Sequence, residues 1–219
     1  MSDAVLIAGA GAELIAALAY EAENRGAKTA VSIISGKNGA AQLSDKLVDE
    51  KALRLEWNPG SPISAQNLVL AAENKIGSIS KGIIVCAAPG NAEAADFSPA
   101  GIDFLVNNYI KSYMFLGREL TRRFRTARNG TLVLALLEEP SSGLLAAPVF
   151  SAFKSFSNGL MTRLNPEYFH IAAFSCEEKN PPPPNEFAAY IFKTLAETKK
   201  LDGGRWFKFT KLKYNLKLA

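Results

Sequence analysis

A glycine-containing turn near the N-terminus is the first place where this sequence could do chemistry. It reads Ala8-Gly9-Ala10-Gly11-Ala12-Glu13-Leu14-Ile15 and follows a short apolar run that is typical of a buried strand. A strand, such a turn and a helix form the usual start of a dinucleotide-binding unit, in which helix amides hold a pyrophosphate. Gly9, Gly11 and Leu14 are therefore candidate cofactor-binding residues.

Glu13 opposes the binding of phosphate at this turn. If its carboxylate lay about 5 Å from a phosphate charge at an effective dielectric of about 20, the repulsion would be roughly 3 kcal/mol, or about two orders of magnitude in affinity. Alternatively, Glu13 simply sits in the first helical turn, where an acid meets the positive end of the helix dipole. We expect NADP or NAD to bind weakly, if either binds at all.

Few residues suit metal or thiol chemistry. The sequence has one histidine, His170, and two cysteines, Cys86 and Cys176, which are too few for a disulfide framework and leave little material for a transition-metal site. Cys86 has no evident histidine partner, so we expect a buried small hydrophobic residue rather than a nucleophile. We therefore expect no metal site.

The positive charge of the chain is mild overall but locally concentrated. Lys and Arg number 25 against 21 Asp and Glu, a formal net charge of +4. Five arginines crowd the end of one predicted helix: Arg118, Arg122, Arg123, Arg125 and Arg128. A solvated helix face is the commoner explanation, so nucleic-acid binding is the third and weakest of our functional hypotheses.

Apolar runs and helical patterns alternate along the chain, which predicts strands joined by crossover helices in a parallel sheet of one α/β domain. The predicted strands are 5–8, 29–34, 53–57, 82–86, 131–136, 170–174 and 205–209. The predicted helices are 11–25, 40–50, 63–75, 99–126, 149–164 and 186–199, with prolines 181–184 as an extended spacer. No export signal or membrane-length apolar run is evident, so we expect a cytoplasmic protein without membrane contact.

The order of these segments resembles the short-chain dehydrogenase/reductase family over nearly all of the 219 residues. The resemblance implies a single-domain Rossmann-like fold over 1–219, with a doubly wound parallel sheet of about seven strands. The first turn of that family reads Thr-Gly-x-x-x-Gly-x-Gly. Gly9 matches its first glycine, whereas Glu13 and Ile15 stand in place of the second and third.

The catalytic positions that the resemblance implies are mostly changed. The family has Tyr-x-x-x-Lys, in which the tyrosine is the general acid, and this chain has Phe150 and Lys154 one helical turn apart. Leu137 stands where the family has a serine that orients the substrate carbonyl. Asn107 matches an asparagine that supports a proton-relay water at a helix irregularity. Lys154 and Asn107 are thus kept, and the family functions at Phe150 and Leu137 are lost.

The resemblance also implies cofactor contacts beyond the first turn. Lys37 follows the second strand, where a basic residue could meet a ribose phosphate, although a loop-surface lysine is commoner. Asn58 and Ala87 follow the third and fourth strands and complete the candidate cofactor set. Lys154 either holds the nicotinamide ribose or packs its stem on the fold with its ammonium in water.

Three hypotheses for function follow. The first is a family-like scaffold without catalysis, kept for assembly, partner binding or nucleotide sensing. The second is an atypical NAD(P)-dependent oxidoreductase with other catalytic residues, for which Ser141 and Ser142 could supply donors, although such a pair more often forms a turn. The third is nucleic-acid binding. Loss of a general acid removes about two to four orders of magnitude in rate, which favours the first hypothesis.

A homo-dimer or homo-tetramer is expected, with a further protein partner as an additional possibility. Members of the family commonly pair their long fourth and fifth helices. Four aromatic residues could supply apolar contact beyond the needs of one core: Tyr109, Tyr113, Phe153 and Phe156.

Overall fold

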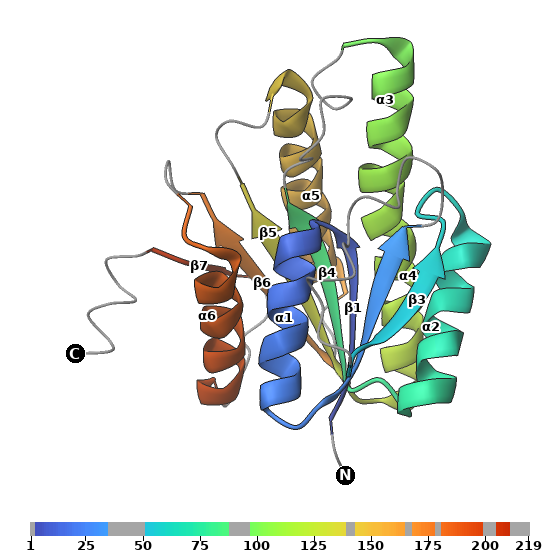
Figure 1. Ribbon diagram of the computed structural model, residues 1–219, viewed down its shortest axis with the longest axis vertical. Coiled ribbons are helices and arrows are strands. Elements are labelled where there is room, and N and C mark those ends of the chain that lie inside the picture. The colour runs from blue at the N-terminus through green and yellow to red at the C-terminus, as the bar shows by residue number, and fades with distance from the viewer. Residues whose placement is uncertain are drawn as a thin grey trace.

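The computed structural model describes residues 3–34, 51–87, 97–138, 143–164, 168–177, 181–198 and 205–210. Its strands are β1 (Ala4–Ala10), β2 (Lys28–Ile34), β3 (Leu53–Trp57), β4 (Lys81–Ala87), β5 (Thr131–Leu137), β6 (His170–Cys176) and β7 (Trp206–Lys208). They form one sheet in the order β3-β2-β1-β4-β5-β6-β7, and every neighbouring pair is parallel. The predicted α/β class, with a doubly wound parallel sheet in a Rossmann-like domain, is confirmed (Figure 1).

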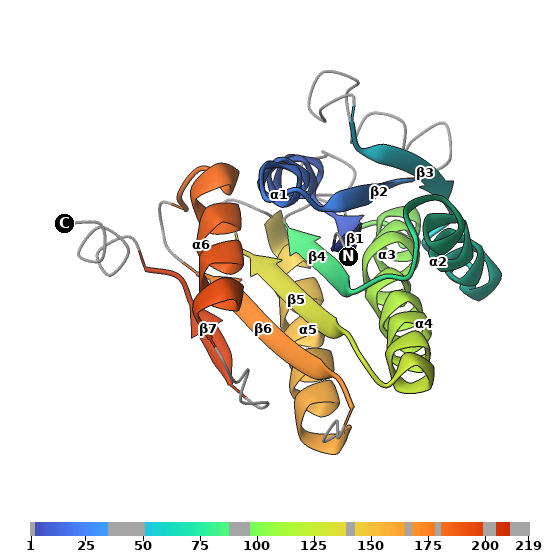
Figure 2. The same cartoon turned by 90° about the horizontal axis from the view of Figure 1, so that it is seen from below.

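Helices cover both faces of this sheet. They are α1 (Ala12–Asn24), α2 (Pro62–Ile76), α3 (Pro99–Leu105), α4 (Lys111–Ala127), α5 (Gly143–Arg163) and α6 (Pro184–Glu197). Figure 2 shows α1 and α6 on one side of the sheet and α2, α4 and α5 on the other. Two apolar cores result, one under each layer of helices.

The strands are apolar without interruption because both of their faces are buried. In β5, Leu132, Leu134 and Leu136 join the core under α2, α4 and α5. Val133 and Leu137 point the other way, into the core under α1 and α6. This alternation decides which side chains at a strand end can reach a given helix.

Several helix boundaries differ from the sequence prediction. The long helical region predicted over 99–126 is confirmed, and within it a π-helical segment, η2 (Val106–Ile110), lies between α3 and α4. The start predicted for the next helix at 149 is too late: α5 begins at Gly143 and includes Pro148, with Leu145 and Ala146 buried in the core. Tertiary packing has overridden the local signal of the proline.

The proline run is not a spacer throughout. Pro184 is the first residue of α6, because a helix tolerates proline at its first position, where the amide has no intrahelical partner in any case. The helix predicted over 40–50 falls outside the described residues. Over the residues that the structure describes, no helix combines the length and the apolar character needed to span a membrane.

Candidate functional site at the carboxyl ends of the strands

The strand order reverses between β1 and β4, and their carboxyl ends form the switch point where ligands usually bind in open α/β sheets. The register aligns Ala10 with Cys86, Ala87 with Leu137, and Leu137 with Cys176. The ends of four strands therefore meet at one edge of the sheet. The candidate site is the set of side chains on and just beyond this edge.

The glycine turn after β1 is shaped by contact with β4. Gly9 and Gly11 have φ values of 134° and 123°, which side chains rarely allow. A Cβ at Gly9 would lie 2.2 Å from the carbonyl oxygen of Val85, and one at Gly11 would lie 2.5 Å from Cβ of Ala87. The close packing of β1 against β4 therefore explains why both positions are glycines. It also places Ala87 against the turn.

The N-terminus of α1 points its first amides at the same edge, but it carries an acid. Glu13 is exposed in the first turn of α1. Leu14 is buried in the core under α1 and α6, so only its backbone could face a ligand. Ile15 is buried as well. The turn therefore presents backbone amides together with one carboxylate.

Lys154 lies between two acids that follow adjacent strands. Its Nζ is 2.7 Å from Oε1 of Glu138, the residue after β5, and 3.3 Å from Oε1 of Glu177, the residue after β6. The Glu138 amide donates to the carbonyl of Cys176 at 3.0 Å, which ties the two strand ends together. We call Lys154, Glu138 and Glu177 the lysine cluster.

The charges in the lysine cluster stabilise one another. Burial by itself would lower the pKa of Lys154, but its hydrogen bond to Glu138 and the charges of both acids outweigh burial and hold that pKa above its ordinary value. Burial would likewise raise the pKa of Glu177, and the charge of Lys154 lowers it overall. Lys154 is therefore a fixed cation at neutral pH and cannot serve as a base.

Phe150 lies one turn before Lys154 and is 6% exposed, in the core under α2, α4 and α5. Leu137 does not share this location, because its side chain belongs to the core on the opposite face of the sheet. The residue at the end of β5 that reaches α5 is Glu138. The structure thus brings Phe150 and the lysine cluster together and places the Leu137 side chain elsewhere.

A buried hydroxyl and a buried thiol lie in the same core. Cys86, near the end of β4, is buried as expected, and burial followed by the charge of Glu138 raises the pKa of its thiol. Tyr113 of α4 is 1% exposed, and its hydroxyl has no hydrogen-bond partner among the described residues. Burial and the neighbouring Cys86 raise the pKa of Tyr113. Both groups are protonated at neutral pH.

Asn107 lies in the π-helical segment, where the Lys111 ammonium donates to its Oδ1 at 2.8 Å. Asn58 lies in the turn after β3, and its Oδ1 accepts from the amide of Gly60 at 3.0 Å. Gly60 also approaches Asn107, because a Cβ added to this glycine would lie 3.5 Å from Cβ of Asn107. Both asparagines therefore lie next to Gly60.

The remaining predicted positions, Lys37, Ser141 and Ser142, fall outside the described residues. Within the described residues, no group of three or more His, Cys, Asp or Glu side chains is placed to hold a metal ion. Sequence reasoning missed the pairing of Lys154 with Glu138 and Glu177. The residues that directly follow parallel strands gather at one edge of the sheet. Listing these residues would have predicted that Glu138 and Glu177 lie close together.

Comparison with known proteins supports the fold through structure and not through sequence. No protein-family model matches the chain, and neither does any curated protein. A short-chain dehydrogenase from Bacillus anthracis superposes with a TM-score of 0.76 at 12% identity, covering 94% of each chain. A putative short-chain dehydrogenase/reductase family oxidoreductase from Aeromonas hydrophila gives 0.73 at 16% identity, covering 95% of this chain and 99% of that one.

A third similar structure contains a cofactor. The NADH-dependent reductase A1-R′, complexed with NAD, gives a TM-score of 0.69 at 15% identity, and 95% of each chain is covered. At such low identities, similarity of structure establishes the fold and leaves the activity open. The chain has the fold of the short-chain dehydrogenases/reductases.

Proposed function

We propose that this chain is a divergent short-chain dehydrogenase/reductase-like protein without standard carbonyl-reductase activity, and that it acts as a nucleotide-sensing or partner-binding scaffold. The observation that carries this proposal is the lysine cluster next to Phe150. Two carboxylates, at 2.7 and 3.3 Å, already engage the ammonium of Lys154. The side chain one turn before Lys154 has no proton to donate.

Carbonyl reduction needs a proton donor at the forming alkoxide. Phe150 cannot act as this donor, and Lys154 is held as a cation by its two acids. The hydroxyl of Tyr113 is buried, so it is not exposed to a substrate at the candidate site. These residues support a rate lower by about two to four orders of magnitude than that of an enzyme with a positioned acid.

The fit to a dinucleotide is partial. The glycine turn and the amides of α1 offer the usual place for a pyrophosphate, and the NAD complex of the similar reductase makes NAD(P) binding plausible. The exposed carboxylate of Glu13 and the neutralised ammonium of Lys154 both weaken attraction for a phosphate-bearing ligand. Weak binding of NADP or NAD is consistent with a sensor and less so with a working reductase.

Titration calorimetry with NADPH and NADH tests this proposal. We expect dissociation constants weaker than about 100 μM for the unmodified protein and tighter binding for Glu13→Gly. Glu13→Gln serves as the matched control, because it removes the charge and keeps the bulk of the side chain. Tight NADPH binding by the unmodified protein would overturn the expectation of weak binding and favour the oxidoreductase candidate described next.

The second candidate is an atypical NAD(P)-dependent oxidoreductase. The observation that favours it is the π-helical segment that contains Asn107, because π-bulges inside helices often mark functional sites. A product formed from a carbonyl substrate together with NADP⁺ or NAD⁺ would support this candidate.

Assembly into a homo-dimer or homo-tetramer stays a prediction. Of the four aromatic residues put forward for an interface, Tyr109, Tyr113 and Phe153 are at most 2% exposed and pack inside the domain. Phe156 alone of the four is partly exposed. Of these four residues, only Phe156 could therefore contribute to an interface.

A further inference from the structure

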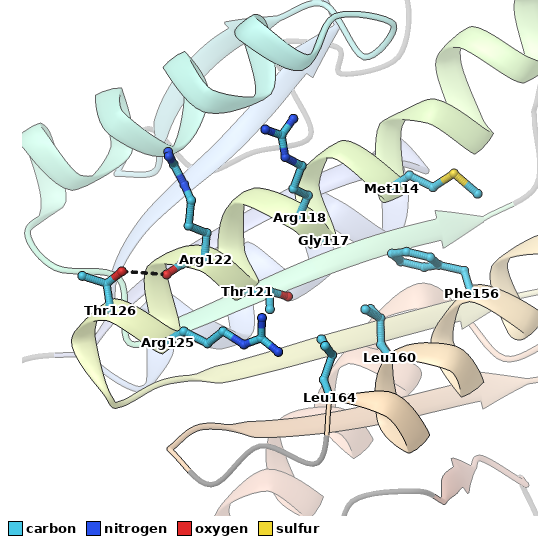
Figure 3. A pocket seen from close by; sticks show the side chains of 10 residues that line it. All are labelled: Met114, Gly117, Arg118, Thr121, Arg122, Arg125, Thr126, Phe156, Leu160 and Leu164. Atoms are coloured by element: carbon cyan, nitrogen blue, oxygen red, sulfur yellow. Dashed lines mark hydrogen bonds between the residues drawn. The ribbon is translucent and has the colours of Figure 1, made fainter.

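Helix α5 presents two different sides to its surroundings. Figure 3 shows Phe156, Leu160 and Leu164 on the side that faces α4, where they line a groove of about 480 Å³. Lys154 of the same helix does not line this groove, because its ammonium reaches the residues that follow β5 and β6. The surroundings of Lys154 are therefore set at the carboxyl ends of the strands.

The two acids of the lysine cluster hold Lys154 unequally. The Lys154 Nζ lies 2.7 Å from Oε1 of Glu138 and 3.3 Å from Oε1 of Glu177. Oε1 of Glu138 is shielded from solvent, and the Glu138 side chain is 24% exposed against 36% for Glu177. The backbone of Glu138 is also fixed by its hydrogen bond to the Cys176 carbonyl. Glu177 is therefore the acid that can leave Lys154 at the lower cost.

A second cation, Lys208 of β7, lies on the same face of the sheet as Glu177. Lys208 is in register with Ser175, two residues before Glu177. Trp206, two residues before Lys208, packs against the core under α2, α4 and α5, so the alternation of side chains places Lys208 on the face that α5 covers. The contact of Glu177 with Lys154 of α5 places Glu177 on that face as well.

Both lysines act on the Glu177 carboxylate. Burial would raise the pKa of Glu177, whereas the charge and hydrogen bond of Lys154 and then the charge of Lys208 lower it overall. Lys208 is exposed, and it forms no ion pair with another residue that the structure describes. Glu177 therefore has two cations within its reach, one on α5 and one on β7.

We propose that Glu177 is a specificity-determining residue, which competes with a nucleotide for the ammonium of Lys154 and turns toward Lys208 when the nucleotide binds. The ammonium then donates to an oxygen of the nucleotide in place of the Glu177 carboxylate. Because the carboxylate moves from one cation to another, the exchange leaves no charge unpaired. The inference rests on the nucleotide-sensing role proposed above, and it names the contact that a bound nucleotide would change.

Titration calorimetry with NADH tests this exchange. We expect Glu177→Gln to bind NADH at least about fivefold more tightly than the unmodified protein, because one carboxylate fewer competes for Lys154. The matched control is Glu197→Gln, which makes the same chemical change at an exposed position at the C-terminal end of α6. Circular dichroism would establish that each variant is folded.

Three results would overturn the proposal. The first is equal affinity of Glu177→Gln and the unmodified protein for NADH. The second is no binding of NADH by Glu177→Gln. The third is an equal gain in Glu197→Gln, which would show that net charge alone sets the affinity.

A double-variant cycle with Lys208 separates the exchange from simple charge repulsion. Lys208→Gln should weaken NADH binding about threefold, the strength of an exposed ion pair, because Glu177 loses its second cation. In the Glu177→Gln background, the same replacement should leave the affinity unchanged. Weakening by the same factor in both backgrounds would overturn the proposal, because Lys208 would then act on NADH directly. All four proteins also carry Glu13→Gln, which removes the opposing charge at the glycine turn and keeps weak binding measurable.

Failure of this inference can be told apart from failure of the proposed function. Weak and equal binding of NADH by the unmodified protein and by Glu177→Gln would overturn the exchange and leave the proposed scaffold role unaffected. Tight binding by the unmodified protein would contradict the expected weak affinity, whereas still tighter binding by Glu177→Gln would support the exchange.

Discussion

At the scale of single residues, Lys154 decides what chemistry the candidate site can do. A lysine that is free at this edge could attract a ribose or a phosphate, whereas here two acids surround it. The cluster is partly exposed, with side-chain exposures of 34% for Lys154 and 24% for Glu138. Solvent screening therefore keeps its contribution to stability modest.

Replacing Lys154 should destabilise the protein, because the two neighbouring carboxylates would then repel each other. We expect Lys154→Met to lower the free energy of unfolding at pH 7 by about 1 to 2 kcal/mol, because Glu138 and Glu177 are left unpaired. Urea unfolding would measure this change. Adding Glu138→Gln to Lys154→Met should recover part of the loss, and no recovery would show that the acids do not repel.

The same cluster gives a defined pH dependence. The lowered pKa of Glu177 makes its contribution present above the ordinary value of 4.5 and lost as pH falls through the folded value. The raised pKa of Lys154 keeps its contribution present below the ordinary value of 10.5. The stability difference between the unmodified protein and Lys154→Met should therefore be flat from about pH 6 to 9 and shrink in acid.

Adding hydroxyl groups should restore reductase activity only on the face of the sheet that packs against α5. We expect Phe150→Tyr with Glu138→Ser to gain detectable NADPH oxidation, because it supplies a donor and releases Lys154 from one acid. Phe150→Tyr with Leu137→Ser should gain none and should unfold more easily, by about 2 to 5 kcal/mol, since Leu137 is 3% exposed in the opposite core. Equal activity of the two double variants would contradict this assignment.

At the scale of elements, the contact between β1 and β4 builds the switch point. A Cβ at Gly9 would lie 2.2 Å from the Val85 carbonyl oxygen, at a φ of 134°. We expect Gly9→Ala to cost about 3 kcal/mol or more in unfolding free energy. The control is Gly159→Ala in α5, where nothing lies within 4 Å and a gain of about 0.5 to 1 kcal/mol is expected. Thermal unfolding of both variants measures the contrast.

The strands and helices also show which parts of the fold could be predicted from the sequence. Strands such as β5 were predictable because both faces are buried and the apolar run is continuous. The exact end of β5 decides whether Leu137 or Glu138 meets α5, and a shift of one residue moves a side chain to the other face. The π-helical segment at Asn107 leaves no signal in hydrophobic periodicity, and only the resemblance to the family indicated a helix irregularity at this residue.

At the scale of the whole molecule, function depends on which surfaces the fold leaves for other molecules. We predict a homo-oligomer, and static light scattering at micromolar concentration should report a multiple of 23.6 kDa. A monomer at this concentration would contradict the prediction of assembly.

The most direct test of the central claim is turnover by the unmodified protein. Ketone and 3-oxoacyl substrates would be offered with saturating NADPH, and absorbance at the nicotinamide band would be followed. Because Phe150 has no proton and Lys154 is held by Glu138 and Glu177, we predict no detectable oxidation of NADPH. Turnover at ordinary enzyme rates, on the order of 1 to 10³ per second, would contradict the account.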